Sequence, residues 1–174
     1  GLGDVYKRQD IDSVVDILKS DWLTQGPTVP KFEESVASKV GAKFGVASNS
    51  ATSALHIAYM SLGLKPGDSV WTSPNTFVAT TNAAIFCGAK VDFVDIDLKT
   101  GLMSIPSLEK KLKNAAIENK LPKVLIPVHL GGNSCEMREI YKLSQKYGFK
   151  IIEDASHAIG GKYNNKYLKQ NKIK

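Results

Sequence analysis

Three short segments of the sequence combine residue types that can bind a charged, planar ligand. The first segment, 48–53, is Ser-Asn-Ser-Ala-Thr-Ser and directly precedes an apolar helical pattern. Free N–H groups at such a helix start, with the hydroxyls of Ser50 and Thr52, are typical of a phosphate site. Ser, Asn and Thr also cap helices in general, so this segment alone leaves both interpretations open. The glycine-rich phosphate loops of ATP-binding and dinucleotide-binding proteins are absent from the sequence.

The second and third segments add an aromatic ring and carboxylates. Phe77, in Pro-Asn-Thr-Phe at 74–77, is either a core residue or a ring that stacks on a planar ligand. In the run 151–158, Ile-Ile-Glu-Asp-Ala-Ser-His-Ala, strand alternation points Glu153 and Asp154 to opposite faces. One carboxylate is then available to a cationic ligand nitrogen. His157 either orients the same ligand or satisfies a local hydrogen bond.

The remaining reactive residues suggest less chemistry. His129 follows an apolar run and precedes two glycines, which fits a ligand contact and a structural role equally well. Cys87 and Cys135 lie far apart, without a CxxC motif or a neighbouring histidine. We therefore expect reduced thiols in a cytoplasmic protein, with no disulfide and no metal site.

Hydrophobic periodicity predicts strands that alternate with helices. Helices are expected at 11–18, 28–41 with Thr28 as N-cap, 51–62, 76–86, 104–112 and 135–147; strands at 44–47, 69–73, 91–94, 124–128 and 150–153. This order favours an α/β fold with a mostly parallel sheet between helices. Ligands of such sheets lie at the carboxyl ends of the strands, and the three segments follow strands there.

Composition limits the possible partners. The 174 residues make about one domain, and 43% hydrophobic against 23% charged residues excludes a disordered chain. The net charge of +6 arises at the two ends, because residues 10–161 carry equal numbers of basic and acidic residues. We therefore expect no nucleic-acid partner. The sequence shows no signal peptide and no apolar run long enough to span a bilayer, so we expect no membrane association.

A phosphate-binding helix start, a stacking ring and a carboxylate are together the parts that a pyridoxal 5′-phosphate (PLP) site needs. At these segments the sequence closely resembles the sugar aminotransferases of the DegT/DnrJ/EryC1/StrS family. The resemblance covers residues 10–168 and implies the large domain of a fold-type I PLP-dependent transferase. It is carried by Leu-Thr-Gln-Gly at 23–26, Phe-Glu at 32–33, Asn-Ser-Ala-Thr-Ser-Ala-Leu at 49–55, Pro-Asn-Thr-Phe-Val-Ala-Thr at 74–80, Val-His-Leu-Gly-Gly at 128–132 and Glu-Asp-Ala-Ser-His-Ala at 153–158.

The resemblance assigns a role to each matching residue. It implies that the phosphate is held by Ala51 and Thr52 with Ser50 beside them, that Phe77 stacks on the ring, that Asp154 pairs with the pyridinium nitrogen, and that His157 lies close to the ring. Leu23 and Thr24 are implied to border the sugar-nucleotide site. Gly131 stands where relatives often have Ala or an aromatic residue.

The resemblance also implies a Schiff-base lysine about thirty residues after Asp154, in a Ser-Phe-His-x-x-Lys setting. That position lies beyond Lys174, and none of the lysines at 162, 166, 169, 172 and 174 has the flanking pattern. We therefore expect a truncated, inactive domain with no catalytic residue of its own. Residues 1–9 are expected to be a non-native leader, and residues 10–174 the N-terminal part of the large domain.

Within the family, 49–55, 156–160 and 163–166 are most similar to transaminases that aminate C4 of a UDP-linked 4-keto-6-deoxy-N-acetylhexosamine with glutamate as donor. The resemblance further implies a homodimer for the full-length enzyme. Two alternatives stay open at this point. One is a PLP-dependent nucleotide-sugar dehydratase of the same fold, in which a histidine replaces the lysine. The other is a nucleotide-sugar-binding domain without enzymatic activity.

Overall fold

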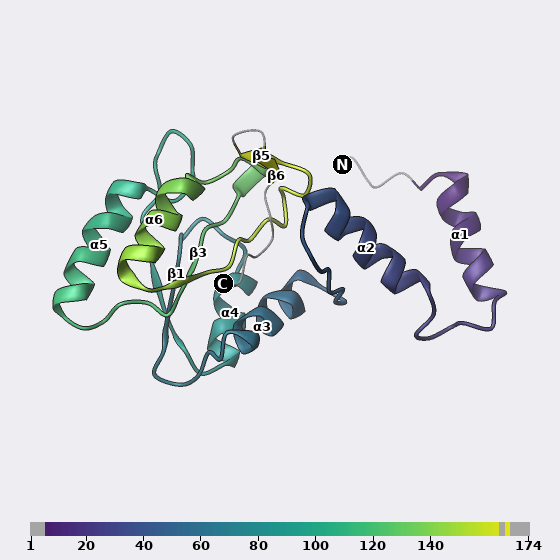
Figure 1. Cartoon of the computed structure of the whole chain (residues 1–174), viewed down its shortest axis with the longest axis horizontal. Helices are drawn as coiled ribbons and strands as arrows, with labels where there is room; N and C mark the ends of the chain where they lie inside the picture. Colours follow the sequence, from purple (N-terminus) through teal and green to yellow (C-terminus); the bar gives the residue numbers. More distant parts are fainter. Residues whose placement is uncertain (1–5, 164–165, 168–174) are drawn as a thin grey trace.

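A four-stranded parallel sheet forms the centre of the molecule (Figure 1). The computed structural model describes residues 6–163 and 166–167 of the chain. The strand order is β2-β1-β3-β4, which places β1 and β3 inside the sheet. The strands are β1 (Ser69–Thr72), β2 (Lys90–Phe93), β3 (Val124–Ile126) and β4 (Lys150–Ile151). All three ladders are parallel, so the expected α/β architecture is confirmed.

Helices cover both faces of this sheet (Figure 1). One face carries α3 (Ala51–Ser61) and α4 (Ala79–Phe86), and the other carries α5 (Ile105–Ile117) and α6 (Met137–Tyr147). Among the described residues, no helix is both long and apolar enough to cross a membrane.

Side-chain alternation along the inner strands divides the core into two layers. Val70 and Val124 pack in the cluster with the residues of α3 and α4. Their neighbours Trp71 and Leu125 pack in the cluster with α5 and α6. All four are buried, with exposed fractions of 3% or less. The strands are therefore apolar on both faces, as a sheet covered by helices on both sides requires.

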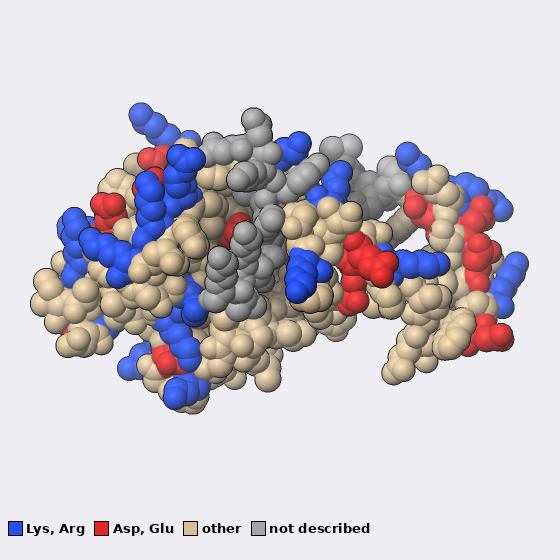
Figure 2. Space-filling model, in the orientation of Figure 1, with Lys and Arg blue, Asp and Glu red and all other residues tan. Residues whose placement is uncertain are grey.

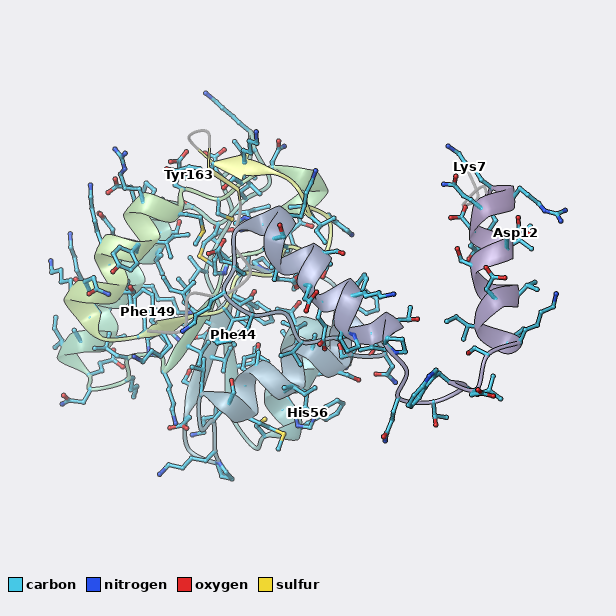
Figure 3. All side chains as sticks on the ribbon, turned by 45° about the vertical axis from the view of Figure 1, so that its right-hand side comes forward. Lys7, Asp12, Phe44, His56, Phe149 and Tyr163 are labelled. Carbon is cyan, nitrogen blue, oxygen red and sulfur yellow. The ribbon has the colours of Figure 1, made fainter. Side chains whose placement is uncertain are left out.

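Two helices precede this core. α1 (Arg8–Leu18) contains no buried residue and stands apart from the sheet (Figures 1 and 3). It begins three residues before the expected start. α2 (Thr28–Val40) ends at Gly41, whose φ of 64° is the left-handed conformation common after a helix. The expected N-cap was wrong by one position, because Pro27 caps α2 and Thr28 is its first helical residue.

The strand expected at 44–47 does not form. The segment has no ladder partner among the described residues and lies against α2 instead. Glu33 of α2 accepts a hydrogen bond from the amide of Ala47 at 2.7 Å through Oε1. A Cβ on Gly45 would lie 2.5 Å from the backbone oxygen of Glu33, so glycine permits this close approach.

The remaining boundaries differ by a few residues. α4 begins at Ala79 rather than at residue 76, so the loop before it carries Phe77. α5 runs to Ile117, five residues beyond its expected end. α6 begins at Met137, and Gly148 caps its end with a φ of 81°. Near the end of the described chain, β5 (Lys162–Tyr163) and β6 (Lys166–Tyr167) pair antiparallel.

Charged side chains are spread over the surface. In the view of Figure 2, lysine and arginine are most frequent over α5 and α6, with acidic side chains among them, and α1 carries both signs.

The connections of the two inner strands leave the sheet in opposite directions. The chain after β1 continues into α4 on one face, and the chain after β3 continues into α6 on the other face. The adjacent carboxyl ends of β1 and β3 are therefore separated by diverging loops. Such a switch point is where open α/β sheets place their ligands.

Candidate functional site

A cavity of about 600 Å³ opens at this switch point; we call it the switch-point cavity. Its lining comes from the start of α3, the loop after β1, the first turn of α4, and the segments after β3 and β4. The lining residues are Ala51, Thr52, Leu55, Asn75, Thr76, Phe77, Ala79, Thr80, Val128, His129, Leu130, Asp154, Ser156 and His157. The three segments singled out in the sequence therefore meet around one cavity.

The start of α3 presents free backbone donors to this cavity. Ser50 is the N-cap residue, and its hydroxyl oxygen accepts the amide N–H of Ser53 at 3.2 Å. Ser50 itself is not among the lining residues. The amides of Ala51 and Thr52 make no hydrogen bond to the described part of the chain. These two N–H groups and the positive end of the helix dipole suit an anion such as a phosphate.

Phe77 is exposed in the loop between β1 and α4. Its exposed fraction is 75%, which excludes the core role that the sequence left open. Phe77 is among the residues that line the switch-point cavity. The loop places the ring there because α4 begins only at Ala79. A flat ligand in the cavity would meet an aromatic face that is free to stack.

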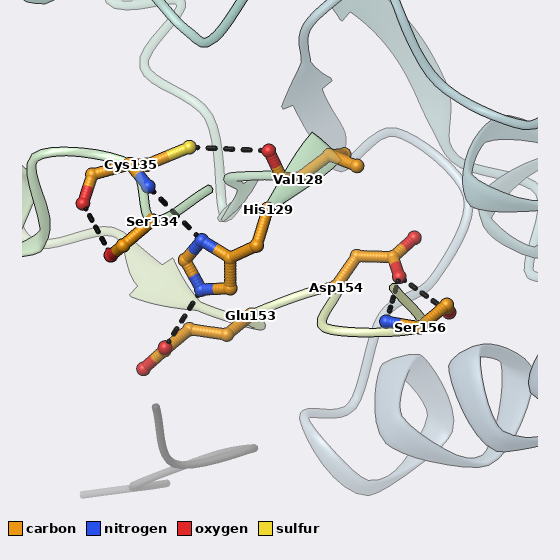
Figure 4. Close-up of polar contacts among 7 residues, drawn as sticks. All are labelled: Val128, His129, Ser134, Cys135, Glu153, Asp154 and Ser156. Atoms are coloured by element: carbon orange, nitrogen blue, oxygen red, sulfur yellow. Dashed lines mark hydrogen bonds and ion pairs between the residues drawn. The ribbon is translucent and has the colours of Figure 1, made fainter. Parts of the chain in front are cut away.

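Asp154 is held by three hydrogen bonds. An isolated parallel bridge to Val128 extends the β3–β4 pairing as far as this residue. Oδ1 accepts the Ser156 amide at 3.2 Å and the Ser156 hydroxyl at 2.7 Å (Figure 4). Oδ2 accepts the hydroxyl of Thr80 at 3.0 Å. Asp154 is 9% exposed and lines the cavity, so its carboxyl group is held in place and is available to a cationic ligand atom.

Glu153, the neighbour of Asp154, has a different partner. Its Oε2 lies 3.1 Å from Nε2 of His129, and the Cys135 amide donates to Nδ1 of the same ring at 3.1 Å (Figure 4). Because Nδ1 accepts, the proton of the ring is on Nε2, and the contact with Glu153 is a hydrogen bond from a neutral histidine. His129 is 1% exposed and its amide donates to the Asp154 carbonyl at 3.0 Å. We call this set of bonds the His129 clasp.

The two cysteines are thiols without a disulfide. Burial raises the pKa of the Cys135 thiol to about 11, and burial also raises the pKa of Cys87. Neither is a thiolate nucleophile at neutral pH. The described residues contain no cluster that could hold a metal ion.

The other residues singled out in the sequence divide into two groups. His157 lines the switch-point cavity beside Asp154. Leu23 and Thr24 lie between α1 and α2 and are exposed, outside the cavity lining. The lysines at 169, 172 and 174 lie outside the described residues, and the described cavity lining contains no lysine.

Sequence reasoning missed Thr80 and Thr76. The hydroxyls of these two residues lie 2.8 Å apart. Thr80 gives its single proton to Asp154, which as a carboxylate has none to return, so Thr76 is the donor to Thr80. Only the four-residue spacing of the two threonines was visible in the sequence. Their link to Asp154 spans 74 residues and needs the folded sheet.

The switch-point cavity fits a ligand with a phosphate, a planar ring and a cationic ring nitrogen. Residues with free backbone amides, an aromatic residue and a buried carboxylate are all part of its lining. PLP has these three features, so the residues present fit this cofactor.

Comparison with known proteins is consistent with this chemistry. Residues 5–171 match the sequence model of the DegT/DnrJ/EryC1/StrS aminotransferase family. The chain is 44% identical over 160 residues to a UDP-4-amino-4,6-dideoxy-N-acetyl-beta-L-altrosamine transaminase of Campylobacter jejuni, covering 91% of this chain and 41% of the relative. It is 38% identical to a UDP-4-amino-4-deoxy-L-arabinose–oxoglutarate aminotransferase of Shewanella sediminis, covering 89% and 38%. The chain thus spans about 40% of the length of such curated relatives.

Solved structures confirm the expected fold. PseC of Helicobacter pylori, an aminotransferase of pseudoaminic acid biosynthesis, superposes with a TM-score of 0.85 at 32% identity, covering 94% of this chain and 43% of that protein. The PLP form of the putative sugar aminotransferase Spr1654 of Streptococcus pneumoniae superposes with a TM-score of 0.84 at 30% identity, covering 94% and 44%.

Proposed function

The chain belongs to the DegT/DnrJ/EryC1/StrS aminotransferase family, whose members depend on PLP, and on this premise we propose that the protein carrying it is a nucleotide-sugar 4-aminotransferase. The substrate we propose is a UDP-linked 4-keto-6-deoxy-N-acetylhexosamine, and the amino donor is glutamate. The relatives named for altrosamine and pseudoaminic acid support this sugar, and the relative named for oxoglutarate supports this donor.

One observation carries the proposal. Thr52, Phe77 and Asp154 follow or begin different elements of the fold, and all three line the switch-point cavity. The free amides at the start of α3, the exposed ring of Phe77 and the buried carboxylate of Asp154 match the phosphate, the planar ring and the ring nitrogen of PLP, one feature each. When bound, PLP supplies an electron-accepting ring that allows an amino group to pass between an amino acid and a keto-sugar.

The residues of this chain have separate tasks in that proposal. The amides of Ala51 and Thr52, with Ser50 behind them, bind the phosphate and fix one end of the cofactor. Phe77 covers one face of the ring and excludes water from it. Asp154 keeps a proton on the ring nitrogen, because the carboxylate stabilises the cationic form.

Three further parts of the proposal rest on the family resemblance. His157 lies beside the ring, and Leu23 and Thr24 border the sugar nucleotide. The lysine that bonds to the cofactor lies beyond Lys174. The active enzyme is a homodimer in the cytoplasm, a compartment in which the free thiols Cys87 and Cys135 are stable.

Label transfer tests the reaction directly. The full-length protein is incubated with PLP, the UDP-4-keto-sugar and glutamate labelled with heavy nitrogen, and the sugar product is analysed by mass spectrometry. We expect the label in the sugar and an equal amount of 2-oxoglutarate. A product that has lost water without gaining nitrogen would instead establish a dehydratase and refute the proposal.

The variant Asp154→Asn tests the site. The amide N–H of Ser156 can only donate, so the asparagine oxygen must face Ser156 and the asparagine NH₂ must face Thr80. Thr80 can accept that bond if it turns its own proton to Thr76. The variant therefore folds but offers a donor where the ring nitrogen needs an acceptor. We expect affinity for pyridoxamine 5′-phosphate (PMP) to fall about ten- to a hundred-fold, measured by fluorescence titration.

A further inference from the structure

We propose that Thr80 is a positioning residue that makes Oδ2 of Asp154 the oxygen that accepts the ring N–H of the cofactor. This inference rests on the proposed function, since it concerns how Asp154 meets PLP or PMP. It extends that function to a residue of α4 to which the family resemblance assigned no role.

The two oxygens of Asp154 are not equivalent. An sp² oxygen has two lone pairs, and Oδ1 uses both, for the amide and the hydroxyl of Ser156. Oδ2 accepts one hydrogen bond among the described residues, from Thr80. The carboxylate therefore has one lone pair left for a ligand in the switch-point cavity, and that pair is on Oδ2.

Thr80 makes three hydrogen bonds, one through its backbone oxygen and two through its hydroxyl. It is 1% exposed at the start of α4. Its backbone oxygen accepts the hydroxyl of Tyr59 at 2.7 Å, and its own hydroxyl oxygen accepts the hydroxyl of Thr76. Because the Asp154 carboxylate can only accept, the Thr80 hydroxyl gives its proton to Oδ2, and its oxygen accepts the proton of Thr76. A bond of fixed direction holds the carboxylate plane, and with it the free lone pair, in one orientation.

Without this hydroxyl, Ser156 would remain the only described donor to the carboxylate. Both of its bonds go to Oδ1, so no hydrogen bond from the described residues would hold Oδ2, and Oδ2 could shift away from the ring nitrogen. The loss would affect a ligand only through its ring N–H. A purely structural role of Thr80 would affect every ligand of the switch-point cavity alike.

The test compares two ligands on the full-length protein. PMP is the first, and the second is an analogue of PMP in which carbon replaces the ring nitrogen. In Thr80→Val the hydroxyl becomes a methyl group of similar volume. We expect the dissociation constant for PMP to rise about tenfold or more, as for a lost hydrogen bond to a charged group, and that for the analogue to stay within about twofold.

Control variants separate positioning from folding. Thr80→Ser keeps the hydroxyl and is expected to restore PMP binding to within about threefold of wild type. Thr81→Val removes the neighbouring hydroxyl, whose partner among the described residues is the backbone oxygen of Val78, and is expected to bind both ligands as wild type does. Should Thr80→Val fail to fold, Thr76→Val removes the hydrogen bond that the Thr80 oxygen accepts, so the Thr80 hydroxyl is held less firmly, and the same selective loss for PMP, though smaller, is expected.

Each outcome supports or overturns the inference. Equal losses for the two ligands, or unchanged PMP affinity in a folded Thr80→Val protein, would overturn it. If Asp154→Asn weakens PMP binding while Thr80→Val does not, the proposed function survives and the role of Thr80 is refuted. If the wild-type protein does not bind PMP, or Asp154→Asn binds it equally well, the proposed function fails as well.

Discussion

The His129 clasp can be tested by replacing its ring with a phenyl group, His129→Phe. Phenylalanine has a similar shape but no ring nitrogen, so the change removes two hydrogen bonds and leaves little empty space. The Cys135 amide, in a residue that is 1% exposed, loses its acceptor, which costs about 1–3 kcal/mol. Glu153 loses the donor Nε2, but its side chain is 16% exposed and water can replace part of this bond. We therefore assign this loss about 1.5 kcal/mol, the lower end of the range for hydrogen bonds to charged groups.

The sum predicts that His129→Phe lowers the free energy of unfolding by about 3 kcal/mol. Urea unfolding of wild type and variant measures this difference, and hydrogen exchange at the Cys135 amide locates it. The exchange rate at Cys135 is expected to rise more than that of amides in α5, because the amide loses its specific acceptor. The control is His56→Phe in α3, where the side chain makes an edge contact with Phe86 and no hydrogen bond that the structure shows.

The control variant should change stability by less than about 0.5 kcal/mol. His129→Gln, whose amide can both accept and donate, should recover part of the loss. The hydrogen bond from the Cys135 amide to the His129 ring would be refuted by a cost for His129→Phe below about 1 kcal/mol, or by unchanged exchange at Cys135.

Three further outcomes are expected. Gly45→Ala should destabilise the protein by about 1–3 kcal/mol in urea unfolding, because its Cβ would meet the Glu33 backbone oxygen at 2.5 Å. Lys123→Met should cost about 0.5–1 kcal/mol at neutral pH. The Lys123 ammonium donates to the Asp68 carboxylate at 2.7 Å and lowers the pKa of that carboxyl below its ordinary value of 3.8. The ion pair therefore stabilises the fold fully above pH 3.8, and this stabilisation is lost as the pH falls through the lowered pKa. The difference in unfolding free energy between wild type and variant should decrease over that pH range. Residues 1–174 alone should show no amino transfer from glutamate in the label assay, because the described cavity lining contains no lysine.

The sequence predicted those elements whose ends carry their own local signals. Gly41 and Gly148 follow α2 and α6 in the left-handed conformation, and both helix ends were placed within one residue. The alternation of short apolar runs with helical patterns also sufficed for the parallel sheet. Each of these signals acts within a few residues, so a single sequence contains it completely.

The errors arose where the deciding contact is distant or the competing structure is a loop. The segment from Phe44 to Ala47 has a strand-like pattern, but a strand needs a second strand to pair with. In the structure the Ala47 amide instead donates to the side chain of Glu33 in α2. The chain between β1 and α4 needs several residues to turn, which delays the helix to Ala79 and leaves Phe77 exposed. A periodic pattern cannot reveal either fact.

For the candidate site, the sequence indicated the residues that would contact a ligand but not the residues that hold them in position. Thr52, Phe77 and Asp154 were identifiable because each follows a strand-like run or begins a helix. Thr80 and Ser156, which orient the carboxylate, are common polar residues whose importance depends on what lies opposite them in the fold. Their roles therefore became visible only from the three-dimensional arrangement.

The neighbouring positions of Glu153 and Asp154 make the length of the chain before them critical. β4 has only two residues, and its pairing with β3 decides that Glu153 meets His129 while Asp154 meets the cavity. An insertion of one residue between α6 and Glu153 would bring Glu153 to the cavity and Ile152 opposite His129. A deletion would bring Asp154 opposite His129 and Ala155 to the cavity, so either change removes the Asp154 carboxylate from the site. The length of this short segment is therefore more strictly constrained than the identity of its residues.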